Sequence, residues 1–148
     1  RYWHDIIGFN YRITNLQAAL GVAQLEKIER LINRKREIAG EYTKALRQTK
    51  GIVHSPEMPW ARSSYWLYSM LVNPDIRDKV VTHLDERGIE TRPFFYPIHT
   101  LPPYREDSKL PVAEQLSARG LNLPSGPKIE DDAIRYVASA VHEALELG

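Results

Sequence analysis

Residues 8–31 read GFNYRITNLQAALGVAQLEKIERL, and this stretch decides the fold because a polar turn runs directly into a long helix. Thr14 stands three residues before Gln17, the spacing of a capping box in which each side chain accepts the backbone N–H of the other residue. Apolar residues then recur in steps of three and four as far as Leu46, which predicts one apolar stripe on a helix over residues 14–48. Such a helix would be roughly 50 Å long, so we expect a kink near residues 29–31.

Small residues fill the first half of this predicted helix, at Ala18, Ala19, Gly21 and Ala23. A glycine inside a helix costs about 1 kcal/mol relative to alanine, so its presence asks for a reason. We interpret Gly21 as a point of close approach to a neighbouring element. The alternative is that the helix simply tolerates a glycine there.

The residues before the turn form a dense apolar run without a helical period: Tyr2, Trp3, Ile6, Ile7, Phe9 and Tyr11. Exposed on a soluble monomer, such a run would make an unusually large apolar patch. We therefore interpret residues 1–13 as the tail end of a preceding domain and residues 14–148 as a separate domain. The chain begins with Arg1 rather than Met, which indicates a piece of a larger protein, and we expect the isolated chain to self-associate.

Beyond the long helix, strands and shorter helices alternate. The run over residues 64–72 is apolar on both faces, which is typical of a central strand. Asn73 and Pro74 provide an N-cap and a first helical residue, and Gly88 provides a stop. Further strands are predicted at 52–54, 89–92 and 121–124, and further helices at 74–87, 111–119 and 130–147. This order predicts an α+β fold, with a small, mainly antiparallel sheet covered by helices and one long N-terminal helix.

The composition is that of an ordinary globular domain: 148 residues, 43% hydrophobic and 26% charged, with a net charge of +1. A near-neutral chain gives no electrostatic drive toward nucleic acid or a membrane, and we expect neither as a partner. Acidic residues interleave with Arg34-Lys35-Arg36, so we interpret this cluster as a solvated helix face rather than a nucleic-acid patch. No cysteine, signal peptide or long apolar run is present, so we expect a cytoplasmic protein.

Asn10 and Arg12 lie two residues apart in the polar turn, just before the helix begins. A guanidinium forks onto phosphate oxygens and an amide adds a neutral donor, so the pair suits an anion clamp. Residues of these types before a helix are also common as plain turn and surface residues.

Residues 93–104 hold four prolines and four aromatic residues, and their stiff backbone excludes a helix. Arg92, Phe94, Tyr96 and His99 can grip an anionic, ring-bearing ligand, with the cations on a diphosphate and the rings on a sugar or base. The alternative is that the two phenylalanines of this loop belong to the core and that His99 bonds to the backbone. The other histidines show no metal-ligand spacing, so we expect no metal site.

Two of these segments resemble a known family. The run from Gly8 to Leu25 resembles the signature of sugar aminotransferases of the DegT/DnrJ/EryC1/StrS family, which are pyridoxal-phosphate enzymes. Residues 88–99, together with Pro102 and Tyr104, resemble the perosamine-synthase branch of that family. The resemblance covers essentially the whole chain and implies the small C-terminal domain of a fold-type-I pyridoxal-phosphate aminotransferase.

The resemblance also implies roles for the candidate residues. Asn10 would reach the pyridoxal 5'-phosphate (PLP) of the neighbouring subunit in a homodimer, with Arg12 close by. Arg92 and His99, together with Phe94 and Tyr96, would bind the substrate. That substrate would be a nucleotide-linked keto sugar such as GDP-4-keto-6-deoxymannose, with glutamate as the amino donor.

The lysine that forms the Schiff base with PLP lies upstream in this family, and none of the seven lysines here stands in a matching context. We therefore assign no catalytic residue to this chain and expect the isolated chain to be inactive. Relatives that carry histidine at that upstream position act as sugar dehydratases, which leaves that activity as an alternative. A third interpretation is a non-catalytic dimerisation module with the long helix as its contact surface.

Overall fold

Thr14 begins the first helix, as the capping-box spacing predicts. In the computed structural model, which describes residues 2–147, α1 (Asn15–Leu25) follows Thr14 directly. The Thr14 hydroxyl accepts the backbone N–H of Gln17 at 3.3 Å, and the Gln17 side chain accepts the backbone N–H of Thr14 at 2.9 Å. Both halves of the capping box are therefore present.

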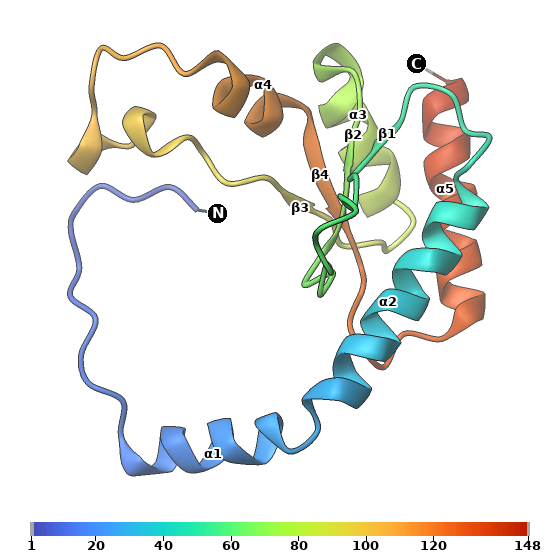
Figure 1. Ribbon diagram of the computed structural model, residues 1–148. Coiled ribbons are helices and arrows are strands. Elements are labelled where there is room, and N and C mark those ends of the chain that lie inside the picture. The colour runs from blue at the N-terminus through green and yellow to red at the C-terminus, as the bar shows by residue number, and fades with distance from the viewer. Residues whose placement is uncertain (1, 148) are drawn as a thin grey trace.

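The helix predicted over residues 14–48, with a kink near residues 29–31, is two separate helices in the structure. A second helix, α2 (Ile28–Ala45), begins after a break at Glu26 and Lys27, two residues earlier than the expected kink. Lys27 leaves the helical conformation, with φ −112° and ψ 5°. Figure 1 shows α2 turning away from α1 toward the sheet. None of the residues of α1 is buried, so no packing holds the two helices in one line.

Four short strands form one antiparallel sheet in the order β1-β2-β4-β3. They are β1 (Val53–His54), β2 (Tyr68–Leu71), β3 (Arg92–Pro93) and β4 (Gly120–Leu123). The register pairs Tyr68 with Leu123 and Arg92 with Asn122. The predicted antiparallel sheet is thus confirmed. The predicted central strand is β2, shorter than expected, and the brief extended piece at 121–124 is the second interior strand, β4.

The remaining helices lie where the sequence places them. Helix α3 (Pro74–Asp85) is capped by Asn73, whose side chain accepts the backbone N–H of Asp75 at 3.0 Å. Gly88 follows it with a φ of +72°, in the left-handed region that glycine adopts freely. Helices α4 (Pro111–Arg119) and α5 (Asp131–Glu146) complete the set. The segment at residues 93–104, expected to exclude helix, contains two single 3₁₀ turns, at Ile98–Thr100 and Pro102–Tyr104. Proline is compatible with the first residues of such short turns.

The core lies between one face of the sheet and helices α2, α3 and α5. Tyr42 of α2 stacks on Tyr68 of β2 with ring centroids 4.8 Å apart, and its hydroxyl donates to the carbonyl of Pro124 at 2.7 Å. On the other face, the Ser69 hydroxyl donates to the Asn122 side chain at 2.7 Å. Figure 1 shows α3 and α5 on one side of the strands and residues 94–119 leaving on the other.

The predicted solvated face at Arg34-Lys35-Arg36 is also wrong, because each cation ties α2 to another segment. Arg34 donates to the carbonyl of Ile129 at 2.7 Å, and Lys35 donates to the carbonyls of Trp66 and Ser125 at 2.7 and 2.5 Å. Arg36 makes a two-pronged ion pair with Glu57 at 2.6 and 3.0 Å and donates to the carbonyl of Ser63 at 2.7 Å. These three side chains act as structural clamps.

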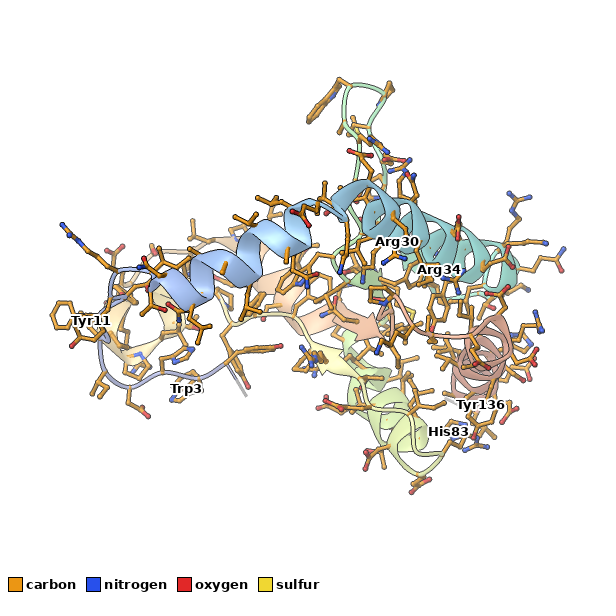
Figure 2. All side chains as sticks on the ribbon, turned by 90° about the horizontal axis from the view of Figure 1, so that it is seen from below. Trp3, Tyr11, Arg30, Arg34, His83 and Tyr136 are labelled. Carbon is orange, nitrogen blue, oxygen red and sulfur yellow. The ribbon has the colours of Figure 1, made fainter. Side chains whose placement is uncertain are left out.

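The N-terminal arm, residues 2–14, runs as an extended chain ahead of α1. Its apolar side chains are exposed, with Phe9 at 84% and Tyr11 at 87%, and Figure 2 shows Tyr11 pointing away from the rest of the chain. The exposed apolar surface continues over α1 at Leu16, Leu20, Val22 and Leu25. A Cβ built on Gly21 meets nothing within 4 Å, so the close neighbour expected there does not come from residues 2–147. Within those residues, no helix is long and apolar enough to cross a membrane.

Candidate functional site

Asn10 and Arg12 are exposed on the arm, immediately before the first turn of α1. They border a shallow hollow lined by residues 9–14 together with Gln17. Within residues 2–147, neither side chain has a hydrogen-bond or ion-pair partner, so all of their donors are available. The hollow has walls from this one segment alone and is open on its other sides.

This donor set fits a phosphate. The guanidinium of Arg12 offers a planar fork for two phosphate oxygens, and the amide of Asn10 adds a neutral donor. The start of a helix also places partial positive charge beside the pair. Because the hollow is open, a bound phosphate needs further walls from another part of the protein.

Arg92 begins β3 beside Asn122 of β4 and is exposed. Its guanidinium has no partner within residues 2–147 and borders a second hollow at the end of the sheet. That hollow is also lined by Lys35, Trp66 and Ser125. Partial burial lowers the pKa of Lys35, whose ammonium group is fully engaged with the carbonyls of Trp66 and Ser125. Among the cations of this hollow, Arg92 is therefore the one available to a ligand.

The aromatic residues of the loop differ in role. Phe94 is half-buried, with its ring directly over Gly120 of β4. The core interpretation is wrong for Phe95, which is 55% exposed and meets Tyr2 at a centroid distance of 4.5 Å. Tyr96 is 45% exposed and packs edge-on against Trp3 of the arm. The loop and the arm thus contact each other through aromatic pairs.

His99 is 9% exposed and bonds to a carboxylate rather than to the backbone. Its Nε2 lies 3.1 Å from Oε1 of Glu114, which also accepts the backbone N–H of Leu110 at 3.0 Å. These two bonds, with Leu110 the stronger cause, lower the pKa of Glu114. The Nδ1 atom of His99 is buried and has no partner among the described residues. His99 therefore fastens the loop to the start of α4.

The four predicted substrate residues lie on β3, on the loop after it and on the 3₁₀ turn at Ile98–Thr100. Within residues 2–147, no hydrogen bond, ion pair or ring contact joins any two of Arg92, Phe94, Tyr96 and His99. Lys35, Trp66 and Glu90 are among the residues that line a hollow with Arg92, and sequence reasoning selected none of the three as site residues. The sequence gives no signal for Trp66, because its 68% exposure follows from the fold.

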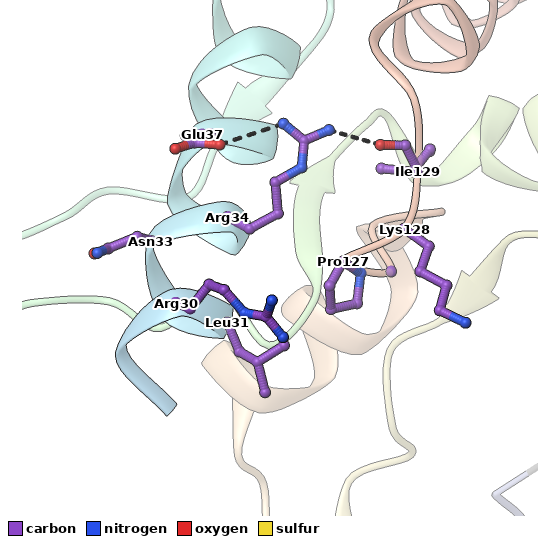
Figure 3. A pocket seen from close by; sticks show the side chains of 9 residues that line it. Arg30, Leu31, Asn33, Arg34, Glu37, Pro127, Lys128 and Ile129 are labelled. Carbon is purple, nitrogen blue, oxygen red and sulfur yellow. Dashed lines mark hydrogen bonds and ion pairs between the residues drawn. The ribbon is translucent and has the colours of Figure 1, made fainter. Parts of the chain in front are cut away.

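A third hollow, of about 1050 Å³, lies between α2 and the turn at residues 126–129. Figure 3 shows Arg30 and Lys128 on its two sides, with Arg34 bonded across to Ile129. Leu31 and Pro127 supply its apolar floor. The described residues contain no group of three or more histidines and carboxylates that could hold a metal ion.

Comparison with known proteins identifies the chain's relatives. Residues 1–142 match the DegT/DnrJ/EryC1/StrS aminotransferase family. GDP-perosamine synthase of Escherichia coli O157:H7 is 41% identical over 152 residues, which span 97% of this chain and 39% of that protein. GDP-perosamine synthase of Vibrio cholerae is 43% identical over 147 residues, which span 95% of this chain and 40% of that protein. The chain thus spans about two fifths of the length of these relatives.

Solved structures share the fold. S. venezuelae DesV, in complex with a ketimine intermediate, matches with a TM-score of 0.84 and 30% identity over 99% of this chain and 40% of its own. The aminotransferase TlmJ from Streptoalloteichus hindustanus matches with a TM-score of 0.83 and 28% identity over 89% of this chain and 36% of its own. Sequence motifs, sequence comparison and fold therefore agree: the chain belongs to the DegT/DnrJ/EryC1/StrS aminotransferase family.

Proposed function

We propose that the protein containing this chain is a PLP-dependent aminotransferase that converts a nucleotide-linked 4-keto sugar into an amino sugar. Residues 14–148 form the small C-terminal domain of this fold-type-I enzyme, and residues 1–13 are the end of its large domain. The family match over residues 1–142 supports this reading, as do the GDP-perosamine synthases among the relatives. Glutamate is the amino donor we expect.

The observation that carries the proposal is the exposed pair Asn10 and Arg12, whose donors have no partner within residues 2–147. We assign both side chains to the phosphate of PLP in the neighbouring subunit of a homodimer. In that position they fix the cofactor without taking part in proton transfer. When bound, PLP acts as the electron sink for amino transfer, and the lysine that attaches it lies in the part of the enzyme upstream of this chain.

On the substrate side, we assign Arg92 to the diphosphate, because its guanidinium has no partner among the described residues and lies on an open hollow. Phe94 and Tyr96 shape the neighbouring surface of the loop. The bonds of His99 to Glu114 and the burial of its second nitrogen support a positioning role, in which His99 holds the loop that carries Tyr96.

The test is an assay of the whole protein with PLP, glutamate and GDP-4-keto-6-deoxymannose, followed by mass spectrometry of the sugar product. We expect a product that carries the amino nitrogen of glutamate, traced with ¹⁵N. A product that has lost a hydroxyl group and gained no nitrogen would instead establish the dehydratase activity. A whole protein that neither binds PLP nor changes the sugar would overturn the proposal.

The exposed apolar face of α1 supports a second candidate, a dimerisation module without catalysis. Gly21 has open space around it, so a second chain can approach the helix closely there. The same surface also serves the homodimer of the proposed enzyme. PLP binding by the whole protein separates the two candidates, because the module alone gives no reason for it.

A further inference from the structure

We propose that Trp66 binds the base of the nucleotide-linked substrate, with Arg92 beside it on the diphosphate. The inference rests on the proposed function and names the part of the substrate that this chain recognises. Three features of the structure carry it: the exposure of Trp66, the backbone that holds it, and the hollow that it shares with Arg92.

The indole of Trp66 is 68% exposed, although both of its neighbours in sequence are at least half-buried. Tyr65 packs against the core, and Tyr68, two residues after Trp66, lies inside the core. An indole carries more apolar surface than any other side chain, and burying it is favourable. The core nevertheless leaves Trp66 outside, while the residues around it are drawn in.

The backbone just before Trp66 has an unusual conformation, and hydrogen bonds hold it on both sides. Tyr65 has a φ of +44°, in the left-handed region that bulky residues rarely adopt. The Tyr65 N–H donates to the Ser63 hydroxyl at 3.1 Å, and the guanidinium of Arg36 lies 5.7 Å from the centre of the Tyr65 ring. On the other side, Lys35 donates to the carbonyl of Trp66 at 2.7 Å. Trp66 is therefore held in place and turned outward by the residues around it.

Trp66 faces a hollow of about 400 Å³ that crosses the end of β4 to Arg92. Its floor is built from Asn122 and Ser125, both almost fully buried. Asn122 donates to the carbonyl of Arg92 at 3.1 Å, and the Ser125 hydroxyl accepts the backbone N–H of Tyr68 at 3.1 Å. The floor is thus rigid, and its polar atoms are engaged within the protein.

Within residues 2–147, the hollow carries an exposed indole and a guanidinium that has no partner, and this pair suits a ligand that joins a planar ring to an anion. Bases stack on aromatic side chains, and a guanidinium forks onto phosphate oxygens. A volume of about 400 Å³ lies in the range of small-molecule sites. A nucleoside diphosphate has both parts, and it is the portion of a nucleotide-linked sugar that takes no part in amino transfer.

The test compares Trp66→Ala with Trp60→Ala in the whole protein, using GDP and dTDP as probes in calorimetric titrations. Trp60 is a matched control, because it is 83% exposed on the same loop and does not line the hollow. We expect Trp66→Ala to weaken nucleotide binding roughly ten- to a hundredfold, the effect of losing one base–aromatic stack. Trp60→Ala should leave the dissociation constant unchanged.

Two further readouts separate recognition from a structural effect. Trp66→Phe should keep most of the affinity, because a phenyl ring still stacks, but lose most of the fluorescence change on nucleotide binding. In the transfer assay, Trp66→Ala should raise KM for the nucleotide sugar and leave KM for the amino donor and kcat unchanged.

The inference is overturned if Trp66→Ala binds as tightly as the parent, if both alanine variants weaken binding equally, or if the parent binds neither probe. These results leave the proposed function standing wherever the parent protein still transfers the amino group. Conversely, nucleotide binding that depends on Trp66 without any amino transfer would contradict the proposed function alone.

Discussion

Gly120 lies directly beneath the ring of Phe94. A Cβ added there would stand 2.0–2.3 Å from three ring carbons, closer than real Cβ contacts come. Gly120→Ala must therefore displace the loop that follows β3 or bend β4, and we expect it to lower the free energy of unfolding by about 1–3 kcal/mol. Urea titration of the chain measures the change.

Gly40 provides the matched control, because it lies inside α2 and an added Cβ meets nothing within 4 Å. Gly40→Ala should raise the free energy of unfolding by up to about 1 kcal/mol through helix propensity. Two variants of equal stability would show that Phe94 does not pack on Gly120 as described.

At the scale of single residues, the sequence predicts exposed polar side chains more readily than side chains whose hydrogen-bond partners lie far away along the chain. Asn10, Arg12 and Arg92 are exposed and have no side-chain partner within residues 2–147, and the ligand chemistry of each follows from its residue type. The partner of His99 is Glu114, fifteen positions away, and Lys35 meets Ser125 ninety positions away. No local pattern specifies such pairs, because the fold alone brings them together.

The loop between β1 and β2 is held to α2 by the ion pair of Glu57 with Arg36. Arg36, helped by the N–H of Ser63, lowers the pKa of the Glu57 carboxyl from its ordinary 4.5 to about 2. A carboxyl with a lowered pKa stabilises the fold above its unfolded pKa and loses that contribution as the pH falls through the folded value. We therefore expect Glu57→Gln to lower Tm at neutral pH, with the gap to the parent closing between about pH 4.5 and about pH 2.

Glu37→Gln is the control for this measurement, because Glu37 lies next to Arg36 on α2 and pairs with Arg34 at 3.3 Å in a more exposed ion pair. Its Tm should follow that of the parent at each pH. A gap between Glu57→Gln and the parent that stays constant with pH would contradict the assigned ion pair.

At the scale of elements, strand and helix positions follow closely from local patterns. Asn73 with Pro74 and the Thr14–Gln17 box mark helix starts through interactions within one turn. The break between α1 and α2 falls two residues before the kink expected at residues 29–31, and local patterns do not fix its place because the apolar stripe continues through it. That stripe serves two surfaces: Ile38 and Tyr42 enter the core, while Leu16 and Leu20 stay exposed.

At the scale of the whole molecule, although Tyr2 and Trp3 contact the loop after β3, α1 and most of the arm remain exposed among the described residues. Their exposed apolar side chains favour association of the isolated chain, since burying such a patch removes it from water. We expect the 148-residue chain to sediment as a dimer or larger species, and Leu20→Glu on α1 to shift it toward monomer.

Val112→Glu is the matched control, because Val112 is 69% exposed and belongs to α4 rather than to the arm or α1. It should leave the sedimentation coefficient unchanged. A parent chain that sediments as a monomer at high concentration would contradict the role assigned to this surface.

Asn10 on the phosphate of a neighbouring subunit is tested most directly in hybrid dimers of the whole enzyme. One subunit carries Asn10→Ala, and the other lacks the upstream lysine that attaches PLP. If Asn10 serves its neighbour, each hybrid has one site with both residues intact, so random mixing restores tight PLP binding at about a quarter of all sites. PLP retained after dialysis, measured by absorbance, should show this recovery, whereas mixed dimers that retain no more PLP than the two variants alone would contradict it.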